Sequence, residues 1–264
     1  MTSPAEGVTA PHPWRSLFWL SARECLRVSK LWTQTMLAPV VSSILFIVVF
    51  GLSLGTRIKE VEGFPYSEFI VPGLIAMAMA QAAYSNNSSS IFQARSDHYV
   101  HDVLAAPMHS WQMHLGLGVG GAFRAILIGA GLMALAIPLT DVPVENPLAL
   151  GVAILLLVIL FGALGAIVGI YAETFDHHTF VNNLVILPLT FLGGVFYSVD
   201  MLGSPWEQLS HANPIFYIVN AVRYGFLGSS DVSVGLSFAV TAALAAVAVA
   251  WSQYLFSTGK RLKP

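Results

Sequence analysis

Two glycine-rich motifs in this chain contain residue types that act in catalysis or nucleotide binding. The run at 51–55 has the Gly-x-Ser-x-Gly spacing of hydrolase nucleophiles around Ser53, but it ends an apolar segment, whereas that motif joins a strand to a helix. The run at 116–121 contains four glycines and opens another apolar segment, where glycines favour close packing of helices. We therefore expect helix packing at 116–121 and no hydrolase site at Ser53.

Neither an ATP site nor a metal site is predicted in this chain. The Gly-Lys pair at 259–260 lacks the upstream glycine and the hydroxyl residue of a phosphate-binding loop, so any ATP is expected on another chain. The histidine pair at 98 and 101 and the Asp-His-His run at 176–178 do not complete a tetrahedral ligand set with a recognisable spacing. Cys25 is the single cysteine, which excludes an internal disulfide and a thiolate cluster.

The composition is that of an all-α polytopic membrane protein. Of 264 residues, 56% are hydrophobic and only 10% are charged, and the mean hydropathy is +0.71, too apolar for an ordinary soluble domain. The net charge of -2 offers no basic field for a phosphate backbone, so nucleic acid is not an expected partner. The first thirty-five residues contain no continuous apolar run of a signal peptide, so we expect the N-terminus in the cytosol.

Six segments are long and apolar enough to cross the hydrocarbon core, which needs about 20 residues per helix. These predicted spans are 36–55, 69–90, 117–139, 148–171, 180–199 and 234–256. An even number of spans places both termini on one side. With that side cytoplasmic, eight of the twelve Lys and Arg residues lie inside and three outside, as the positive-inside rule requires. The remaining cation, Arg124, is expected to snorkel to the cytoplasmic interface.

The segment before the first span is predicted to be an amphipathic helix over 14–34, after a flexible tail at 1–13. Its polar face is formed by Ser16, Arg23, Arg27, Lys30 and Gln34. Such a helix lies in the membrane interface, with its rings in the acyl boundary and its cations among lipid headgroups. The pattern alone fits a simple lipid anchor as well as a helix that transmits movement.

Two connections between the spans are predicted to carry structure of their own. Residues 95–108 form a cytoplasmic loop with helical propensity up to Pro107. Residues 200–231 are too long for a turn and rich in aromatic residues, and backbone at membrane depth must bond internally, so we expect a re-entrant helical hairpin. Arg223 in this hairpin is expected to pair with Asp200, Glu207 or a helix C-terminal carbonyl, or to contact a lipid headgroup.

Several polar residues lie inside the predicted spans, where each must face a partner, a cavity or the bundle interior. The ones that stand out are Gln81, Tyr84, Asn87, Asn182 and Asn183. They serve either as hydrogen-bonding contacts between helices or as the lining of a transport route, and the residue types fit both roles. No Asp or Glu inside a span indicates proton coupling.

A pattern over the last third of the chain resembles the signature of ABC-2 type exporter permeases. It consists of Ile186, Leu189, Leu192, Gly193, Val195, Leu202, Gly203, Pro214, Ile215, Tyr217 and Arg223. The likeness extends over almost the whole chain, which would form a single transmembrane domain. It implies that 14–34 is the connecting helix of the family, that 200–231 caps the outer end of the pathway, and that the route runs among spans one, two and five at a homodimer interface.

The same resemblance implies that 95–108 is the coupling helix, through the Leu-Ala-Ala-Pro run at 104–107. A permease without its own motor must dock onto two copies of a separate ATP-binding subunit, which would bind ATP and Mg. The residues expected at this dock are Arg95, Tyr99, Asp102, Val103, Leu104 and Pro107.

The predicted function is that of a permease subunit in the bacterial plasma (inner) membrane, not of an enzyme. It would export an amphipathic substrate, such as a lipid, a lipid-linked glycan or a hydrophobic drug, while contacting membrane lipid. The alternatives are an ATP-independent channel or carrier, a hydrolase using Ser53, and a non-transporting scaffold.

Overall fold

The structure is a computed structural model that describes residues 13–53, 55, 58, 60–97 and 99–261. These residues are mostly helical. The helical elements are α1 Pro13–Lys30, the π-helix η1 Thr33–Leu37, α2 Ala38–Ser53, α3 Tyr66–Ser96, α4 Val100–Ala105, α5 Ser110–Thr140, α6 Pro147–Tyr171, α7 Phe175–Val181, the π-helix η2 Asn182–Ile186, α8 Leu187–Leu192, the short 3-10 helix η3 Val199–Met201, α9 Trp206–Ala212, α10 Pro214–Leu227 and α11 Val234–Thr258. Strands β1 Glu60–Val61 and β2 Phe64–Pro65 pair antiparallel.

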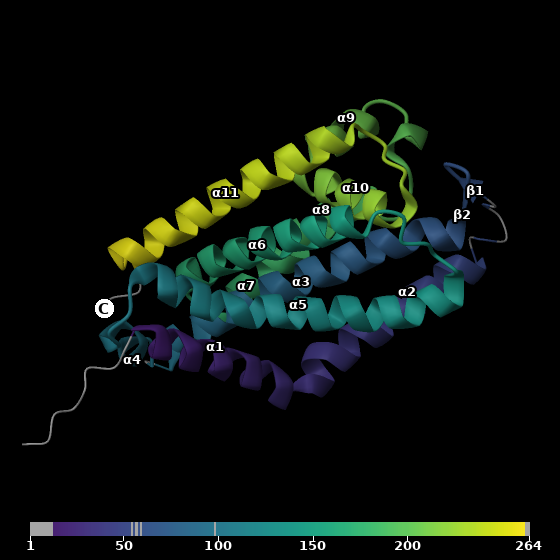
Figure 1. The fold of residues 1–264 in the computed structure, drawn as a ribbon. Helices are drawn as coiled ribbons and strands as arrows, with labels where there is room; N and C mark the ends of the chain where they lie inside the picture. Colours follow the sequence, from purple (N-terminus) through teal and green to yellow (C-terminus); the bar gives the residue numbers. More distant parts are fainter. Residues whose placement is uncertain (1–12, 54, 56–57, 59, 98, 262–264) are drawn as a thin grey trace, which may run out of the picture.

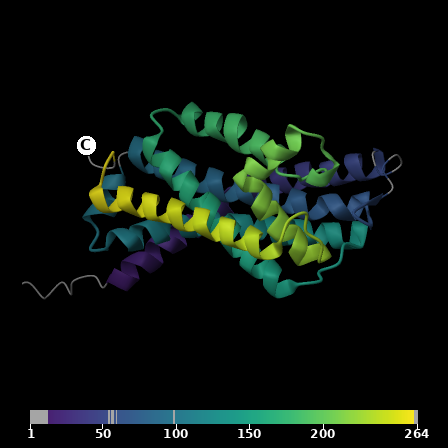
Figure 2. The same ribbon diagram turned by 90° about the horizontal axis from the view of Figure 1, so that it is seen from above.

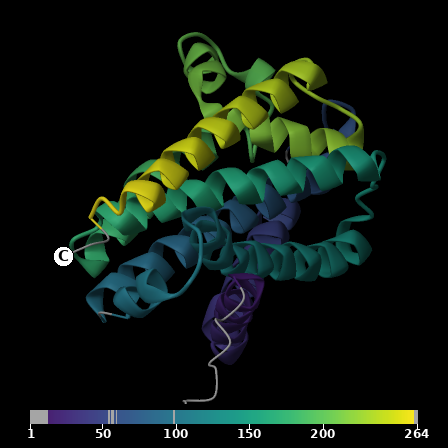
Figure 3. The same ribbon diagram turned by 60° about the vertical axis from the view of Figure 1, so that its left-hand side comes forward.

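The long helices lie roughly side by side, with α3 at the centre of the bundle (Figure 1). Figure 3 shows α1 and α2 on one flank, α11 on the other, and α3, α5 and α6 between them. Figure 2 shows α11 crossing in front of the other helices and the α7–α8 run along the upper edge of the view. The described end of α1 and the end of α11 both lie at the end of the bundle where α4 is found (Figure 1).

Four described helical segments are long and apolar enough to span a membrane. They are Thr33–Gly51, Ser110–Thr140, Pro147–Tyr171 and Val234–Thr258. They correspond to the predicted spans 36–55, 117–139, 148–171 and 234–256. The structure therefore agrees with the prediction of an all-α membrane protein.

The other two predicted spans have a different character. Segment 69–90 lies within the longer α3, whose polar run near its end makes it less apolar than its neighbours although most of it is buried. Segment 180–199 begins in a helical run over 175–192 that stops at Leu192, because the chain reaches Gly193 and then Gly194, whose φ of 76° is left-handed. The helical part is therefore shorter than the predicted 180–199.

Glycines set how closely the helices pack around α3. A Cβ added at Gly116 would lie 2.7 Å from Leu20 Cδ2 of α1, and one at Gly120 would lie 2.9 Å from Glu24 Cβ. At Gly165 on α6 the added atom would collide with the carbonyl of Tyr84 on α3. The prediction that the run at 116–121 serves helix packing is confirmed, since a side chain there would push the helices apart.

Candidate functional site

The end of the bundle remote from α4 holds a buried charged cluster centred on Arg223 of α10. This side chain is fully buried, its Nη1 lies 3.5 Å from Asp231 Oδ2, and its Nη2 donates to the carbonyl of Gly194. The guanidinium also lies over the ring of Phe69 of α3, 4.1 Å from its centroid. The expected helix-terminal carbonyl is confirmed, because Gly194 follows the end of α8. The expected pairing with Asp200 or Glu207 is wrong, since the acid that reaches Arg223 is Asp231.

Asp231 in turn contacts a second acid, Glu62, in the turn between β1 and β2. Burial and the hydrogen bond to Glu62 raise the pKa of Asp231 to about 7. Burial alone would raise the pKa of Glu62, but hydrogen bonds from Asp231 and neighbouring serines, with the charge of Arg223, lower it to about 2. The two carboxyls therefore share one proton between pH about 2 and about 7. We call Arg223, Asp231, Glu62, Gly194 and Phe69 the outer cluster.

The order of residues around α10 explains why the outer cluster forms. Asn213 caps α10 by accepting from Ile215 N at 3.0 Å, and Pro214 fits the first turn because its missing N–H is not needed there. Asn220 Oδ1 accepts from Asp231 N at 2.9 Å, which turns the chain back over α10. Asp231 Oδ2 is then held by Val199 N at 3.2 Å.

The remaining residues of the predicted signature lie close to this end of the molecule. Leu192 and Gly193 end α8, and Tyr217 of α10 donates its hydroxyl to the carbonyl of His211 at 2.9 Å, which ties α9 to α10. Leu192, Gly193 and Tyr217 thus lie where α8, α9 and α10 pack near Arg223.

The shared proton predicts how the stability of this end depends on pH. The folded pKa of Asp231, about 7, lies above its ordinary value of 3.8, so the folded state holds a proton that the unfolded state has released. Stability is therefore expected to fall as pH rises from about 4 to about 7. Asp231→Asn should make the stability less dependent on pH over this range, as measured by thermal unfolding in detergent at a series of pH values. An unchanged slope between pH 5 and 7 in that variant would contradict the shared proton.

A second polar cluster lies towards the other end of the bundle, between α1 and α3. Glu24 of α1 is completely buried and its Oε2 accepts from Arg27 Nη2 at 2.9 Å and from Ser90 Oγ at 2.8 Å. Arg27 Nη2 also donates to Asn86 Oδ1 at 3.2 Å. We call Glu24, Arg27, Asn86 and Ser90 the inner cluster.

The inner cluster changes the interpretation of the first helix. The expectation that all of its cations lie among headgroups is wrong for Arg27, which turns into the protein because Glu24 and Asn86 supply acceptors. Arg23 lies over the ring of Tyr99, 4.2 Å from its centroid, and so joins α1 to the segment before α4. The aromatic side of the helix is exposed as expected, with Trp19 69% exposed. Glu24 was not singled out by the sequence pattern.

Arg124 of α5 reaches the junction that precedes the first predicted span. Its Nε donates to the carbonyl of Thr35 at 3.0 Å, within the π-helical junction of α1 and α2.

The predicted coupling residues divide into inward and outward groups. Arg95 donates to the carbonyls of Ile170 at 2.6 Å and Ala172 at 2.9 Å, so it caps the end of α6. Tyr99 is half-buried, with its hydroxyl 3.4 Å from the carbonyl of Ser90, and Val103 packs beside it. Asp102 and Pro107 are exposed, and the side chain of Leu104 is outside the described part. Asp102 of α4 and Pro107 just after it therefore lie on the exposed surface.

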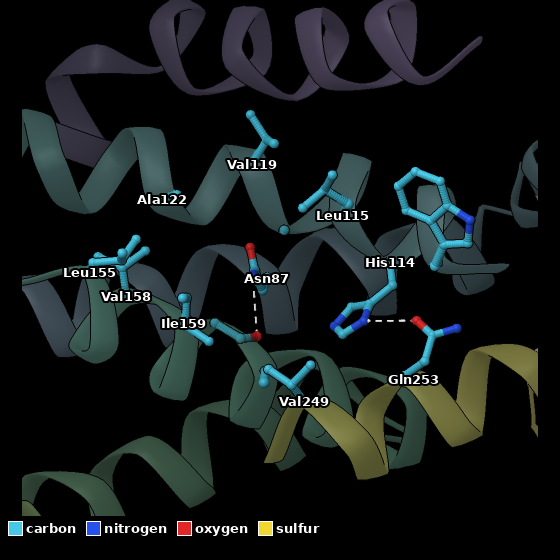
Figure 4. Close-up of a pocket in the computed structure, with 14 residues that line it drawn as sticks. Asn87, His114, Leu115, Val119, Ala122, Leu155, Val158, Ile159, Val249 and Gln253 are labelled. Atoms are coloured by element: carbon cyan, nitrogen blue, oxygen red, sulfur yellow. Dashed lines mark hydrogen bonds between the residues drawn. The ribbon is translucent and has the colours of Figure 1, made fainter. Parts of the chain in front are cut away.

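One of the predicted route residues, Asn87 of α3, lines a cavity of about 650 Å³ between α5, α6 and α11. Figure 4 shows Asn87 at the centre of the view, among the other residues that line this cavity. Gln81 and Tyr84 belong to the same helix but are not among the residues that line this cavity. Asn182 donates to Asn183 Oδ1 at 3.0 Å on the π-helix η2. The structure brings Asn182 and Asn183 together, and neither is among the residues that line the cavity beside Asn87.

Two other sequence candidates can be located only in part. Among the residues that the structure describes, no three His, Cys, Asp or Glu side chains gather as a metal site would require. The side chain of Ser53 and residues 1–12 of the predicted tail at 1–13 lie outside the described residues, and Pro13 begins α1.

Comparison with known proteins gives one family over most of the chain. The family model described as ABC-2 type transporter matches residues 15–227. The inner membrane transport permease YadH of Escherichia coli (strain K12) is 36% identical over 252 residues, which cover 95% of this chain and 98% of YadH. Nodulation protein J of Rhizobium leguminosarum bv. viciae is 26% identical over 243 residues, 90% of each chain. Nodulation protein J of Rhizobium meliloti (strain 1021) is 25% identical over 234 residues, 88% of this chain and 87% of the relative.

Proposed function

The chain belongs to the ABC-2 type transporter family, and on this premise we propose that it is the permease subunit of an ATP-driven exporter in a bacterial inner membrane. It acts as a homodimer with two copies of a separate ATP-binding subunit, which binds ATP and Mg. Its substrate is amphipathic, such as a lipid, a lipid-linked glycan or a hydrophobic drug. This chain contributes conformational change rather than covalent chemistry.

The proposal includes six spans, with α3 and the 175–192 run added to the four apolar helices. Helix α3 has 31 residues, and at 1.5 Å per residue its length of about 46 Å exceeds a hydrocarbon core of about 30 Å. Its polar residues are accommodated because neighbouring helices surround it. The pair α9 and α10 forms the re-entrant hairpin. Both termini are cytoplasmic, which the common location of the described ends of α1 and α11 supports (Figure 1).

The observation that carries the mechanism is the inner cluster. Glu24 and Arg27 of α1 hold Asn86 and Ser90 of α3, while Arg23 of α1 lies over Tyr99 beside α4. A partner that pushes on α4 therefore moves α1 and the end of α3 together. The junction η1 continues directly into α2, so this displacement passes into the first span. The outer cluster, at the other end, holds the hairpin that closes the route.

The test is ATP hydrolysis by the chain purified in lipid nanodiscs after co-expression with a cognate ABC ATP-binding subunit. The charge reversal Asp102→Arg on the exposed side of α4 should lower ATP hydrolysis by the complex roughly tenfold. The reason is that reversing a charge within a docking surface removes its electrostatic complementarity to the ATP-binding subunit. Asp200→Arg makes the same change on an exposed residue near α9, at the other end of the bundle, and should leave the rate unchanged.

The outcomes separate the proposal from its alternatives. A complex that forms, hydrolyses ATP and loses activity only in Asp102→Arg supports the coupling role of α4. Equal rates of ATP hydrolysis in Asp102→Arg and Asp200→Arg would show that α4 is not part of the docking surface. If no ATP-binding subunit associates, an ATP-independent channel or carrier, or a membrane scaffold, becomes the better explanation.

A further inference from the structure

The turn that follows α8 carries Phe196, whose ring joins the outer end of α2 to α8. Its centroid lies 5.0 Å from that of Phe50 and 6.2 Å from that of Phe46, both on α2, and 5.3 Å from that of Phe191 on α8. These separations lie in the range of attractive aromatic pairs. We call Phe46, Phe50, Phe191 and Phe196 the ring cluster.

The turn between α8 and η3 is held in place by α3 and α10. The Tyr66 hydroxyl of α3 donates to the carbonyl of Phe196 at 3.1 Å, and Arg223 of α10 donates to the carbonyl of Gly194. Val195, between these two residues, is completely buried. Among the residues that the structure describes, no hydrogen bond links this turn to α2. Helix α2 is therefore able to separate from the turn by giving up apolar contacts alone, while the turn stays with α3 and α10.

A polar stripe on α3 leads from the inner end of the bundle towards the ring cluster. It consists of Gln81, Ser85 and Ser89, which recur every four residues on one side of the helix and are all half-buried. The Nε2 of Gln81 is buried without a hydrogen-bond partner, which leaves a donor for water or substrate. Polar side chains inside a span face protein or water rather than lipid. At the inner end of α3 the stripe leads to Ser96, which is exposed.

The ring cluster lies outward of this stripe. Gln81 lies about 22 Å along α3 from Tyr66, at 1.5 Å per residue, and Tyr66 holds the turn that carries Phe196. Figure 1 shows the end of α2 and the start of α3 at the end of the bundle remote from α4. Closely packed rings leave no space for water, so the ring cluster closes the outer end of a path along the stripe.

The same cluster receives the displacement that the proposed function assigns to α2. A push on α4 passes through α1 and η1 into α2, and the stacked rings of Phe46 and Phe50 lie in the second half of α2. Because the turn is fixed to α3 and α10, a movement of α2 relative to α3 changes the distance between these rings and Phe196. The contact thus lies where ATP-driven movement of the first span reaches the outer side.

We propose that Phe196 is the outer gate of the export route, closed by its packing against Phe46 and Phe50 and opened when α2 moves away. This gate rests on the proposed function, because the ATP-binding subunits supply the movement of α2. Opening exposes the polar stripe of α3 to the outer side, while the turn keeps its hydrogen bonds to Tyr66 and Arg223.

Closure by Phe196 is tested without the ATP-binding subunit, through the accessibility of a cysteine in the stripe. Ser85→Cys, made in a Cys25→Ser background, is treated in spheroplasts with a membrane-impermeant methanethiosulfonate reagent from the outer side. Phe196→Ala should raise its labelling rate about tenfold, because truncating a packed ring leaves a cavity. Phe180→Ala is the matched control, since Phe180 of α7 is 59% exposed and lies outside the ring cluster. It should leave the rate unchanged.

A second variant and a second reporter keep this test independent of misfolding. Phe50→Ala removes the other side of the contact and should raise labelling of Ser85→Cys as Phe196→Ala does. Ser88→Cys, on the same helix, replaces a completely buried side chain and should stay unlabelled in both variants. Unchanged labelling of Ser85→Cys, or an equal rise at Ser88→Cys, would overturn the gate.

Opening is tested by cross-linking the two sides of the gate. Phe50→Cys and Phe196→Cys, again in the Cys25→Ser background, replace rings whose centroids lie 5.0 Å apart, so a short bifunctional thiol reagent should cross-link the resting chain rapidly. In the complex with the ATP-binding subunit, Mg-ATP and vanadate should lower the cross-linking rate about tenfold, because a ligand shifts a conformational equilibrium towards the state that it binds more tightly.

The outcomes distinguish the gate from the proposed function. A complex that hydrolyses ATP but cross-links at the same rate with and without vanadate would overturn the gate and leave the proposed function standing. If no ATP-binding subunit associates, the proposed function fails, whereas the labelling of Ser85→Cys still decides whether Phe196 closes the outer end of the stripe.

Discussion

Arg223→Gln is expected to lower the free energy of unfolding by about 3–5 kcal/mol, the cost of removing one partner of a buried ion pair. Arg223 is fully buried, and it bonds to Asp231 and Gly194 while lying over Phe69. A glutamine side chain is neutral, so it offers no positive charge to Asp231, to the Gly194 carbonyl or to the ring of Phe69. The loss should be measured by denaturant unfolding of the purified chain in detergent.

The size of the Arg223 effect is tested by two further variants. Arg223→Lys keeps the charge but loses the planar fork that contacts Asp231 and Gly194 together, so an intermediate loss is expected. Arg261→Gln is the matched control, because Arg261 pairs with Glu173 at 3.6 Å with both side chains exposed, at 46% and 69%. It should change stability by about 1 kcal/mol or less. A loss in Arg223→Gln no larger than in the control would show that the outer cluster does not hold the hairpin.

Apolar length predicted the helices that carry most of the fold. The predicted spans 117–139, 148–171 and 234–256 lie within α5, α6 and α11, because an apolar run exposed to lipid has to be helical along its whole length. Helix α3 extends to both sides of 69–90, since its polar residues bond within the bundle and a hydropathy pattern cannot register such partners. The shorter helical run at 175–192 ends at a glycine pair whose conformation depends on the packing of α10.

The two charged clusters were hidden because their members are far apart along the chain. Glu62 precedes α3 whereas Asp231 follows α10, and Glu24 and Ser90 are 66 positions apart, so no local spacing indicates that they meet. Asp231 lies beyond the signature pattern, which explains why Asp200 and Glu207 were expected to pair with Arg223. A lone acid such as Glu24 in a cationic helix was the one available signal, because it must find a partner or face water.

Glu24→Ala is expected to lower the free energy of unfolding by about 2–3 kcal/mol, within the range of hydrogen bonds to charged groups. Ser90 and Arg27 both lose their carboxylate, and Ser90 is completely buried. The loss is smaller than for Arg223 because Arg27 is 22% exposed and can turn to water. This loss in the free energy of unfolding should be measured by denaturant unfolding of the purified chain in detergent.

The same substitution separates stability from coupling. Without the Glu24 carboxylate, α1 loses its bond to Ser90 of α3. A push on α4 then no longer moves α1 and the end of α3 together, so the complex should assemble while its ATP hydrolysis becomes insensitive to substrate. Glu24→Gln retains an acceptor for Ser90. Because only the charge is lost, it should lower the free energy of unfolding by about half as much as Glu24→Ala. Glu173→Ala removes an exposed acid paired with Arg261 and should alter neither property measurably. If Glu24→Ala loses stability but keeps normal coupling, the inner cluster only packs α1 against α3, and force must reach the first span by another contact.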